Sequence, residues 1–167
     1  AWVANAGAGA ERRVESRWDI RVGKRSERVG LHGRGAGDVA GTVWDSLGRP
    51  VCEFAPGTAC GLTSGFGATT EYRHVPGTPG AADPIARLSF VEVRRREPNA
   101  PQGYLTTRSH FDALGRERLT TNEQLIVDPP APDGRPALET VVARQLDYGP
   151  NGKPVRSFAP YVAPASG

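Results

Sequence analysis

The chain has 167 residues, enough for one ordinary domain or for a piece of a larger one. Leu, Ile, Val and Phe contribute 33 residues, close to the lower limit for a chain that buries its own core, and 21 Gly and 15 Pro interrupt the sequence throughout. A formal net charge of +3 excludes self-repulsion as a cause of disorder, and no apolar run approaches the ~20 residues of a membrane-spanning helix. These numbers favour a turn-rich β structure with a small core. The front of the chain shows no signal-peptide pattern. Because the chain starts at Ala1 and contains no Met, we expect an excised segment.

The two ends of the chain, residues 1–17 and 163–167, are predicted to be frayed segments around a folded stretch that covers residues 18–162. For residues 10–22 the sequence allows either a helix or a strand. The apolar residues that begin at Val14 recur at every fourth position, as they do on one face of a helix.

The later windows that contain neither Gly nor Pro are predicted to be mostly strands. They cover residues 85–97, 104–114, 116–128 and 137–148. In the first of these windows the apolar side chains switch faces at Phe90–Val91, which indicates a β-bulge. The same window contains the densest basic cluster, and we expect Arg94 and Arg96 to share a solvated face rather than to bind phosphate.

A short motif recurs along the chain: an apolar or aromatic residue, Asp, a few residues, Gly, and then Arg or Lys. Its copies are Trp18-Asp19 with Gly23-Lys24, Trp44-Asp45 with Gly48-Arg49, Phe111-Asp112 with Gly115-Arg116, and Leu146-Asp147 with Gly152-Lys153. Each copy predicts a β-hairpin turn. The Asp carboxylate accepts hydrogen bonds from amides two or three residues ahead, and the Gly adopts a positive φ. The basic residue begins the return strand and reaches back to the Asp.

The motif copies therefore predict an all-β fold of antiparallel β-hairpins, with turns near residues 44–49, 111–116 and 146–153. The expected antiparallel pairs are residues 40–45 with 49–54, 104–112 with 116–127, and 141–147 with 153–158. Gly48 and Gly115 are expected to have positive φ, and Leu114 is expected to be more exposed than Phe111.

These copies resemble the signature of the YD-repeat, or Rhs (rearrangement hotspot), proteins. The second half of the chain is similar to the B component of insecticidal toxin complexes (Tc) and to virulence plasmid B proteins. There, Asn151–Arg156 and Pro160-Tyr161 match the strand that follows the hairpin. Ala159 replaces an acidic residue of that pattern, and the Gly-rich Leu31–Gly37 replaces the usual Asp-x-Asn-Gly. The resemblance covers roughly residues 18–162.

The resemblance implies a spiralled β-sheet shell that encloses a separate toxic domain until delivery. It implies a non-catalytic segment, without cofactor or metal, of a secreted or cell-surface bacterial virulence protein. The expected partners are the remainder of the parent shell protein, the enclosed toxin domain and a toxin-complex translocation subunit; neither nucleic-acid binding nor membrane insertion is expected. The self-cleaving aspartyl protease of such shells has no matching segment here, and Asp83-Pro84 is expected to be a turn.

Two other function classes stay open. A free-standing carbohydrate-binding β module of a secreted or cell-surface protein needs an exposed aromatic platform, for which Trp18 and Trp44 are the candidates. A hydrolytic enzyme would use Asp45 and Asp112 as paired acids. Their identical turn context favours backbone capping instead, so we expect no enzyme activity.

The cysteines and histidines complete the candidate residues. Cys52 and Cys60 lie eight residues apart across a Pro-Gly turn, and both a disulfide and two free thiols fit this spacing. His32, His74 and His110 share no metal-ligand spacing, and His110 is expected to be a packed strand residue.

Overall fold

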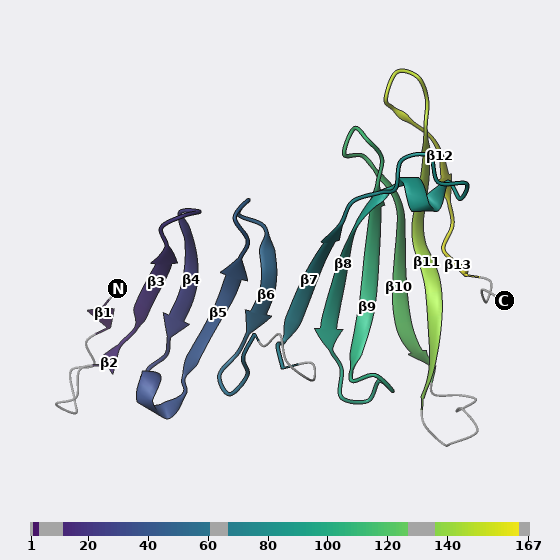
Figure 1. Ribbon diagram of the computed structural model, residues 1–167. Coiled ribbons are helices and arrows are strands. Elements are labelled where there is room, and N and C mark those ends of the chain that lie inside the picture. Colours follow the sequence, from purple (N-terminus) through teal and green to yellow (C-terminus); the bar gives the residue numbers. More distant parts are fainter. Residues whose placement is uncertain (1, 4–11, 61–66, 127–135, 164–167) are drawn as a thin grey trace. The chain divides into compact units, whose positions relative to one another are not determined.

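The computed structural model describes residues 2–3, 12–60, 67–126 and 136–163 (Figure 1). Within these residues all regular structure is β-strand, apart from two 3-10 helices of three residues each. The all-β fold predicted from the sequence is confirmed. Strands β3 to β12 pair with their neighbours along the chain in an antiparallel meander, and β13 adds to β11. By compactness the chain divides into two units, residues 1–71 and residues 72–167.

The first unit is built from short strands. It contains β1 (Trp2–Val3), β2 (Arg12–Arg13), β3 (Glu15–Asp19), β4 (Lys24–Val29), η1 (Arg34–Ala36), β5 (Val39–Trp44) and β6 (Pro50–Phe54), and it ends within β7 (Thr70–Val75). β1 and β2 form a separate two-stranded ladder. The hairpins β3–β4 and β5–β6 are joined side by side by the pairing of β4 with β5.

The described residues between 12 and 22 form strands and a turn, so the helical alternative for residues 10–22 is wrong. Trp18 pairs with Arg25 of β4 and is 62% exposed, which means that the fourfold apolar spacing does not mark a buried face. Backbone pairing with β4 satisfies the groups that a helix would have bonded internally. Residues 10 and 11 lie outside the described residues.

The second unit has longer strands. It contains the end of β7, η2 (Ile85–Arg87), β8 (Ser89–Arg96), β9 (Tyr104–Phe111), β10 (Glu117–Ile126), β11 (Ala137–Tyr148), β12 (Pro154–Phe158) and β13 (Tyr161–Val162). β12 and β13 share the side of β11 that β10 leaves free. The three antiparallel hairpins expected from the motif are confirmed near their turns. The outer parts of two of them do not pair as expected, since Val141 and Val142 pair with β13 and the described β9–β10 pairs end at Thr107 opposite Asn122.

The β-bulge expected at Phe90–Val91 is absent from the β8–β9 ladder, whose register runs unbroken from Ser89 opposite Phe111 to Arg96 opposite Tyr104. The apolar pattern misled because the most buried residue of β8 is an acid. Glu92 is only 3% exposed. In β8, the positions of the apolar residues therefore do not show which face of the strand is buried.

Few side chains of the described residues are buried. In the first unit they are Val29, Cys52, Ala68 and Thr70, and in the second unit Glu92, Ala100, Thr106, His110, Val142 and Leu146. This sparse burial is consistent with the absence, among the described residues, of any helix long enough to cover the sheet. Polar contacts add to the few apolar ones in the second unit. Glu92 lies 2.7 Å from Arg108 and 2.9 Å from Arg94. Burial opposes ionisation of Glu92, yet the two guanidinium groups hold the pKa of its carboxyl below the ordinary value.

Candidate functional site

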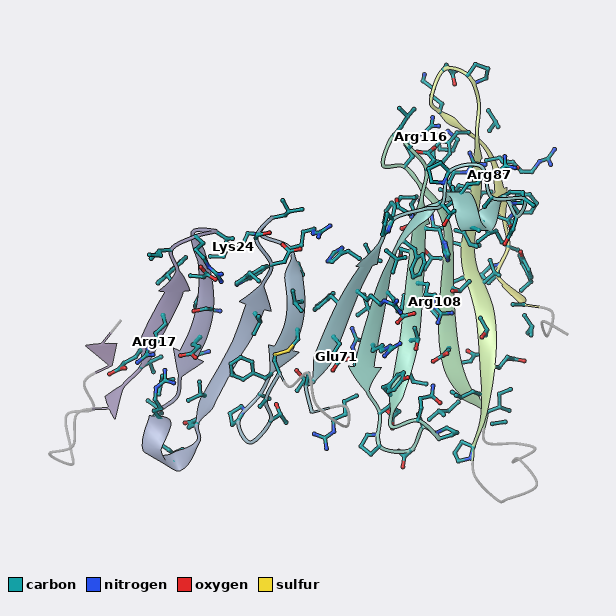
Figure 2. The ribbon with its side chains drawn as sticks, in the orientation of Figure 1. Arg17, Lys24, Glu71, Arg87, Arg108 and Arg116 are labelled. Carbon is teal, nitrogen blue, oxygen red and sulfur yellow. A yellow bond between two sulfur atoms is a disulfide. The ribbon has the colours of Figure 1, made fainter. Side chains whose placement is uncertain are left out.

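The motif copies lie where hairpin strands reverse, and we call the four reversals the motif turns. They are residues 19–24, 45–49, 112–116 and 149–153. Figure 2 labels Lys24 in the first unit and Arg116 in the second, each at the end of such a turn.

Two motif turns share one hydrogen-bond pattern. In the turn 45–49, the backbone N–H of Asp45 donates to the carbonyl of Arg49 at 2.9 Å, and Gly48 N–H donates to the carbonyl of Asp45 at 3.1 Å. The carboxylate of Asp45 accepts the amides of Leu47 and Arg49, both at 2.9 Å, and the Arg49 Nε at 2.7 Å. The capping role expected of this Asp is confirmed for the amide two residues ahead, whereas the second donor lies four residues ahead and not three.

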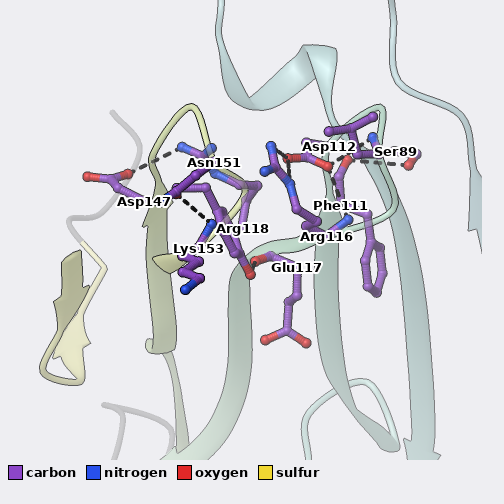
Figure 3. A network of polar contacts seen from close by, with 11 residues as sticks. Ser89, Phe111, Asp112, Arg116, Glu117, Arg118, Asp147, Asn151 and Lys153 are labelled. Atoms are coloured by element: carbon purple, nitrogen blue, oxygen red, sulfur yellow. Dashed lines mark hydrogen bonds and ion pairs between the residues drawn. The ribbon is translucent and has the colours of Figure 1, made fainter. Parts of the chain in front are cut away.

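The turn 112–116 repeats this pattern in the second unit (Figure 3). Asp112 accepts the amides of Leu114 and Arg116, both at 3.0 Å, and the Arg116 Nε at 2.8 Å. The Arg116 side chain lowers the pKa of Asp112, and the backbone N–H of Arg49, followed by its side chain, lowers that of Asp45. Both carboxylates are therefore held ionised as turn acceptors, which makes them poor proton donors for acid catalysis.

The glycines behave as the motif requires. Gly48 has φ 72° and Gly115 has φ 74°, so both occupy the left-handed region that a side chain disfavours. The residue before each glycine projects into solvent: Leu47 is 74% exposed and Leu114 is 76% exposed, whereas Phe111 is half-buried.

The first motif turn is one residue longer and uses a different cation. The N–H groups of Val22 and Gly23 both donate to the carbonyl of Asp19. Arg21, not Lys24, binds the Asp19 carboxylate, with Nη2 at 2.7 Å, and this bond lowers the pKa of Asp19. The expected return contact from Lys24 to Asp19 is therefore wrong.

The last motif turn begins two residues later than the sequence predicted. Gly149 occupies the position that Asp45 and Asp112 hold, since its N–H donates to the carbonyl of Lys153 at 3.0 Å. Asn151 caps the turn by accepting the Lys153 amide at 3.1 Å. Asp147 stays in β11 and pairs with Arg118 at 3.3 Å, as Figure 3 shows. The assignment of Asp147 as a turn residue is wrong.

A feature that sequence reasoning missed is a bulge beside every motif turn. In each hairpin the register shifts by one residue at the last pairs before the turn. The unpaired residue always lies two positions after the basic residue that closes the turn. These residues are Ser26, Val51, Arg118 and Val155. Turn and bulge thus form one structural unit, which re-aims the return strand.

Neighbouring motif turns are also braced against each other in both units. The Lys24 ammonium lies 4.5 Å from the centre of the Trp44 ring and donates to the carbonyl of Gly48 at 2.8 Å. The Arg116 guanidinium lies 4.6 Å from the centre of the Tyr148 ring, whose hydroxyl donates to the carbonyl of Glu117 at 2.9 Å. In each case the basic residue of one turn stacks on the aromatic residue that introduces the next, a cation–π contact.

These contacts engage Trp44 but not Trp18, the two candidates for a carbohydrate platform. A groove of about 640 Å³ in the first unit is lined by Trp18, Trp44 and Phe54, among others. Lys24 lies over the Trp44 ring, and the Trp44 indole N–H donates to the carbonyl of Arg25 at 3.2 Å. Trp18, by contrast, is largely exposed. The two tryptophans therefore do not form a matched pair of free stacking surfaces.

Other candidates have structural surroundings. His110 is 8% exposed and packs against Phe90, with ring centres 5.2 Å apart. Asp83 accepts the Ile85 amide at 2.9 Å, as a turn residue does. Arg94 and Arg96 lie two apart in an unbroken register and so share a face of β8, as expected. On that face Arg94 is half-buried, because it pairs with Glu92 and stacks on a tyrosine, while Arg96 is exposed.

Across the described parts of the chain, no three His, Cys, Asp or Glu side chains converge as metal ligands would. The helices found there are too short to cross a lipid bilayer. Cys52 and Cys60 form a disulfide. No protein-family model, curated protein or solved structure matches the chain. A functional interpretation therefore rests on the repeated turn and its surroundings.

Proposed function

We propose that the chain is a non-catalytic β-sheet segment of a bacterial Rhs- or Tc-type toxin shell that encloses a toxic effector domain and helps to deliver it. The observation that supports this proposal is the repetition of one turn. The Asp-x-Leu-Gly-Arg sequence builds the same hydrogen-bond pattern at residues 45–49 and 112–116, in two separate units.

The pairing of the strands supports a wall rather than a catalytic domain. Consecutive hairpins pair side by side, and few of the described side chains are buried. Repeats that contact only their neighbours can be added without limit, because each addition buries the same surface against the last. A wall of this kind can extend until it surrounds a second domain.

The expected partners are the remainder of the parent shell protein, the enclosed toxin domain and a translocation subunit. The proposed location is outside the bacterial cytoplasm, and the Cys52–Cys60 disulfide favours an oxidising compartment.

Protease protection tests the proposal directly. In the parent protein, we expect the enclosed domain to resist a protease that digests it rapidly once residues 18–162 are deleted. Leu114→Ala is the matched control, since it removes an exposed side chain without touching the turn bonds and should leave protection intact. Equal digestion with and without residues 18–162, or a parent chain without further motif turns, would contradict the proposal.

The exposed Trp18 supports a second candidate, a carbohydrate-binding module. A glycan array would favour it by showing binding that Trp18→Ala abolishes and Leu47→Ala retains. The absence of Trp18-dependent binding would exclude it. Trp44→Ala is not a clean probe, because it also removes the brace to Lys24.

A further inference from the structure

The disulfide lies at one of the two shortest strand pairings described for the first unit. Cys52 is in β6, opposite Val43 of β5 on one side and opposite Glu71 of β7 on the other. The described register between β6 and β7 consists of two residue pairs, against four between β5 and β6. The cystine therefore lies on β6 next to the shorter of its two strand pairings, the one with β7.

The cystine is also a large part of what the first unit buries. Its buried apolar residues among those described are Val29, Cys52 and Ala68, and Cys52 is 5% exposed. Cys60 lies at the other end of the bridge and is half-buried, so it is the more exposed residue of the two.

Few other contacts between described residues hold the segment between the two cysteines. The Thr58 hydroxyl accepts from the N–H of Ala55 and donates to its carbonyl, both at 2.8 Å, which closes a local turn without tying it to the sheet. After Cys60, the described residues rejoin β6 where Thr69 donates to the carbonyl of Glu53, from its N–H at 2.9 Å and its hydroxyl at 3.0 Å. Among the described residues, the disulfide is thus the main side-chain link from residues 55–60 to the sheet.

We infer that Cys52–Cys60 is a redox-responsive latch. When oxidised it holds residues 55–60 on β6 and supports the β6–β7 pairing, and when reduced it releases both while the second unit keeps its structure. The inference goes beyond the proposed function and does not depend on it. Only its biological use, loosening of a delivered shell segment in a reducing target cytosol, rests on the proposed function.

The chemistry is thiol–disulfide exchange with a dithiol reductant of the thioredoxin class. Its thiolate attacks the Sγ of Cys60, the more exposed cysteine. The S–S bond breaks, and the Sγ of Cys52 leaves with the electron pair and takes up a proton. The second thiol of the reductant then attacks the mixed disulfide and releases Cys60 as a thiol. Two electrons and two protons pass to the protein, and the reductant becomes a disulfide.

Hydrogen exchange measured by mass spectrometry on the full chain, with and without dithiothreitol, tests the latch. We expect reduction to raise exchange at least about tenfold in residues 50–54 and 67–71. Residues 89–96 and 104–111 should change by less than about twofold, as an internal control. Alkylation of the same samples should detect two new thiols.

A double variant, Cys52→Ala with Cys60→Ala, should exchange rapidly without reductant and should not respond to it. Two outcomes overturn the inference: unchanged exchange in residues 50–54 although both thiols are alkylated, or an equal rise in both units. Because the wild-type comparison needs no substitution, poor folding of the double variant leaves the test intact. Neither outcome bears on cargo protection, so failure of the latch is distinguishable from failure of the proposed function.

Discussion

Replacing Gly115 by Val should cost about 2 kcal/mol in the free energy of unfolding. The residue has φ 74°, and a Cβ added there meets nothing within 4 Å, so the penalty is backbone strain and not a clash. A left-handed conformation costs an L-residue about 1–2 kcal/mol, and β-branching raises this towards about 3 kcal/mol. The smaller conformational freedom of Val in the unfolded chain returns roughly 0.4–1 kcal/mol.

Urea unfolding of the full chain, followed by far-ultraviolet circular dichroism, measures this cost. Gly35→Val is the matched control, because a Cβ at Gly35 also meets nothing and no positive φ is involved; it should change stability by less than about 0.5 kcal/mol. Gly115→Asn should recover most of the loss, since Asn tolerates the left-handed region. Equal costs for the two Val variants would refute the turn assignment.

Three further predictions concern neighbouring contacts. Asp112→Ala should lower the urea midpoint more than Asp147→Ala does, because Asp112 accepts three bonds within its turn and Asp147 makes one long ion pair; the reverse order would contradict the corrected register. A double-mutant cycle of Arg116→Gln and Tyr148→Leu should give a coupling free energy of about 0.5–1 kcal/mol between the two side chains. A coupling of zero would contradict a stabilising contact between them. Burial, and then Arg108, lower the pKa of His110 below its ordinary 6.5, so the unfolded chain binds the extra proton and stability should fall as pH drops below about 6.5. His110→Gln should flatten that part of a pH series of urea midpoints, and an unchanged slope would contradict the assignment.

The hairpins could be predicted from the sequence because their cause is local. The Asp, Gly and Arg of residues 112–116 supply the acceptor, the backbone conformation and the cation within five positions, and no distant residue is required. The same reasoning from local residues predicted the wrong start for the last turn. Asp147 matches the motif in type, but Asn151 and Gly149 satisfy the turn two residues later.

The features that could not be predicted depend on the neighbouring strand. Glu92 is buried because Arg108, sixteen residues away, pairs with its carboxylate. The bulges at Ser26 and Val51 exist only as a difference in register between two strands, and nothing in the residue types marks them. Three apolar residues at helical spacing were likewise insufficient, since Trp18 lies in β3 with an exposed side chain and the spacing therefore marks no buried face.

The braces between motif turns explain how a sheet with so few buried residues can specify its own spacing. Lys24 on Trp44, and Arg116 on Tyr148, each fix the distance from one turn to the next, while the bulge beside each turn sets the direction in which the return strand leaves. Both devices act between nearest neighbours and need no central core. Stability in such a sheet is then expected to be a sum of hairpin and neighbour terms. Breaking one brace should loosen the hairpins on either side of it and leave more distant ones unchanged.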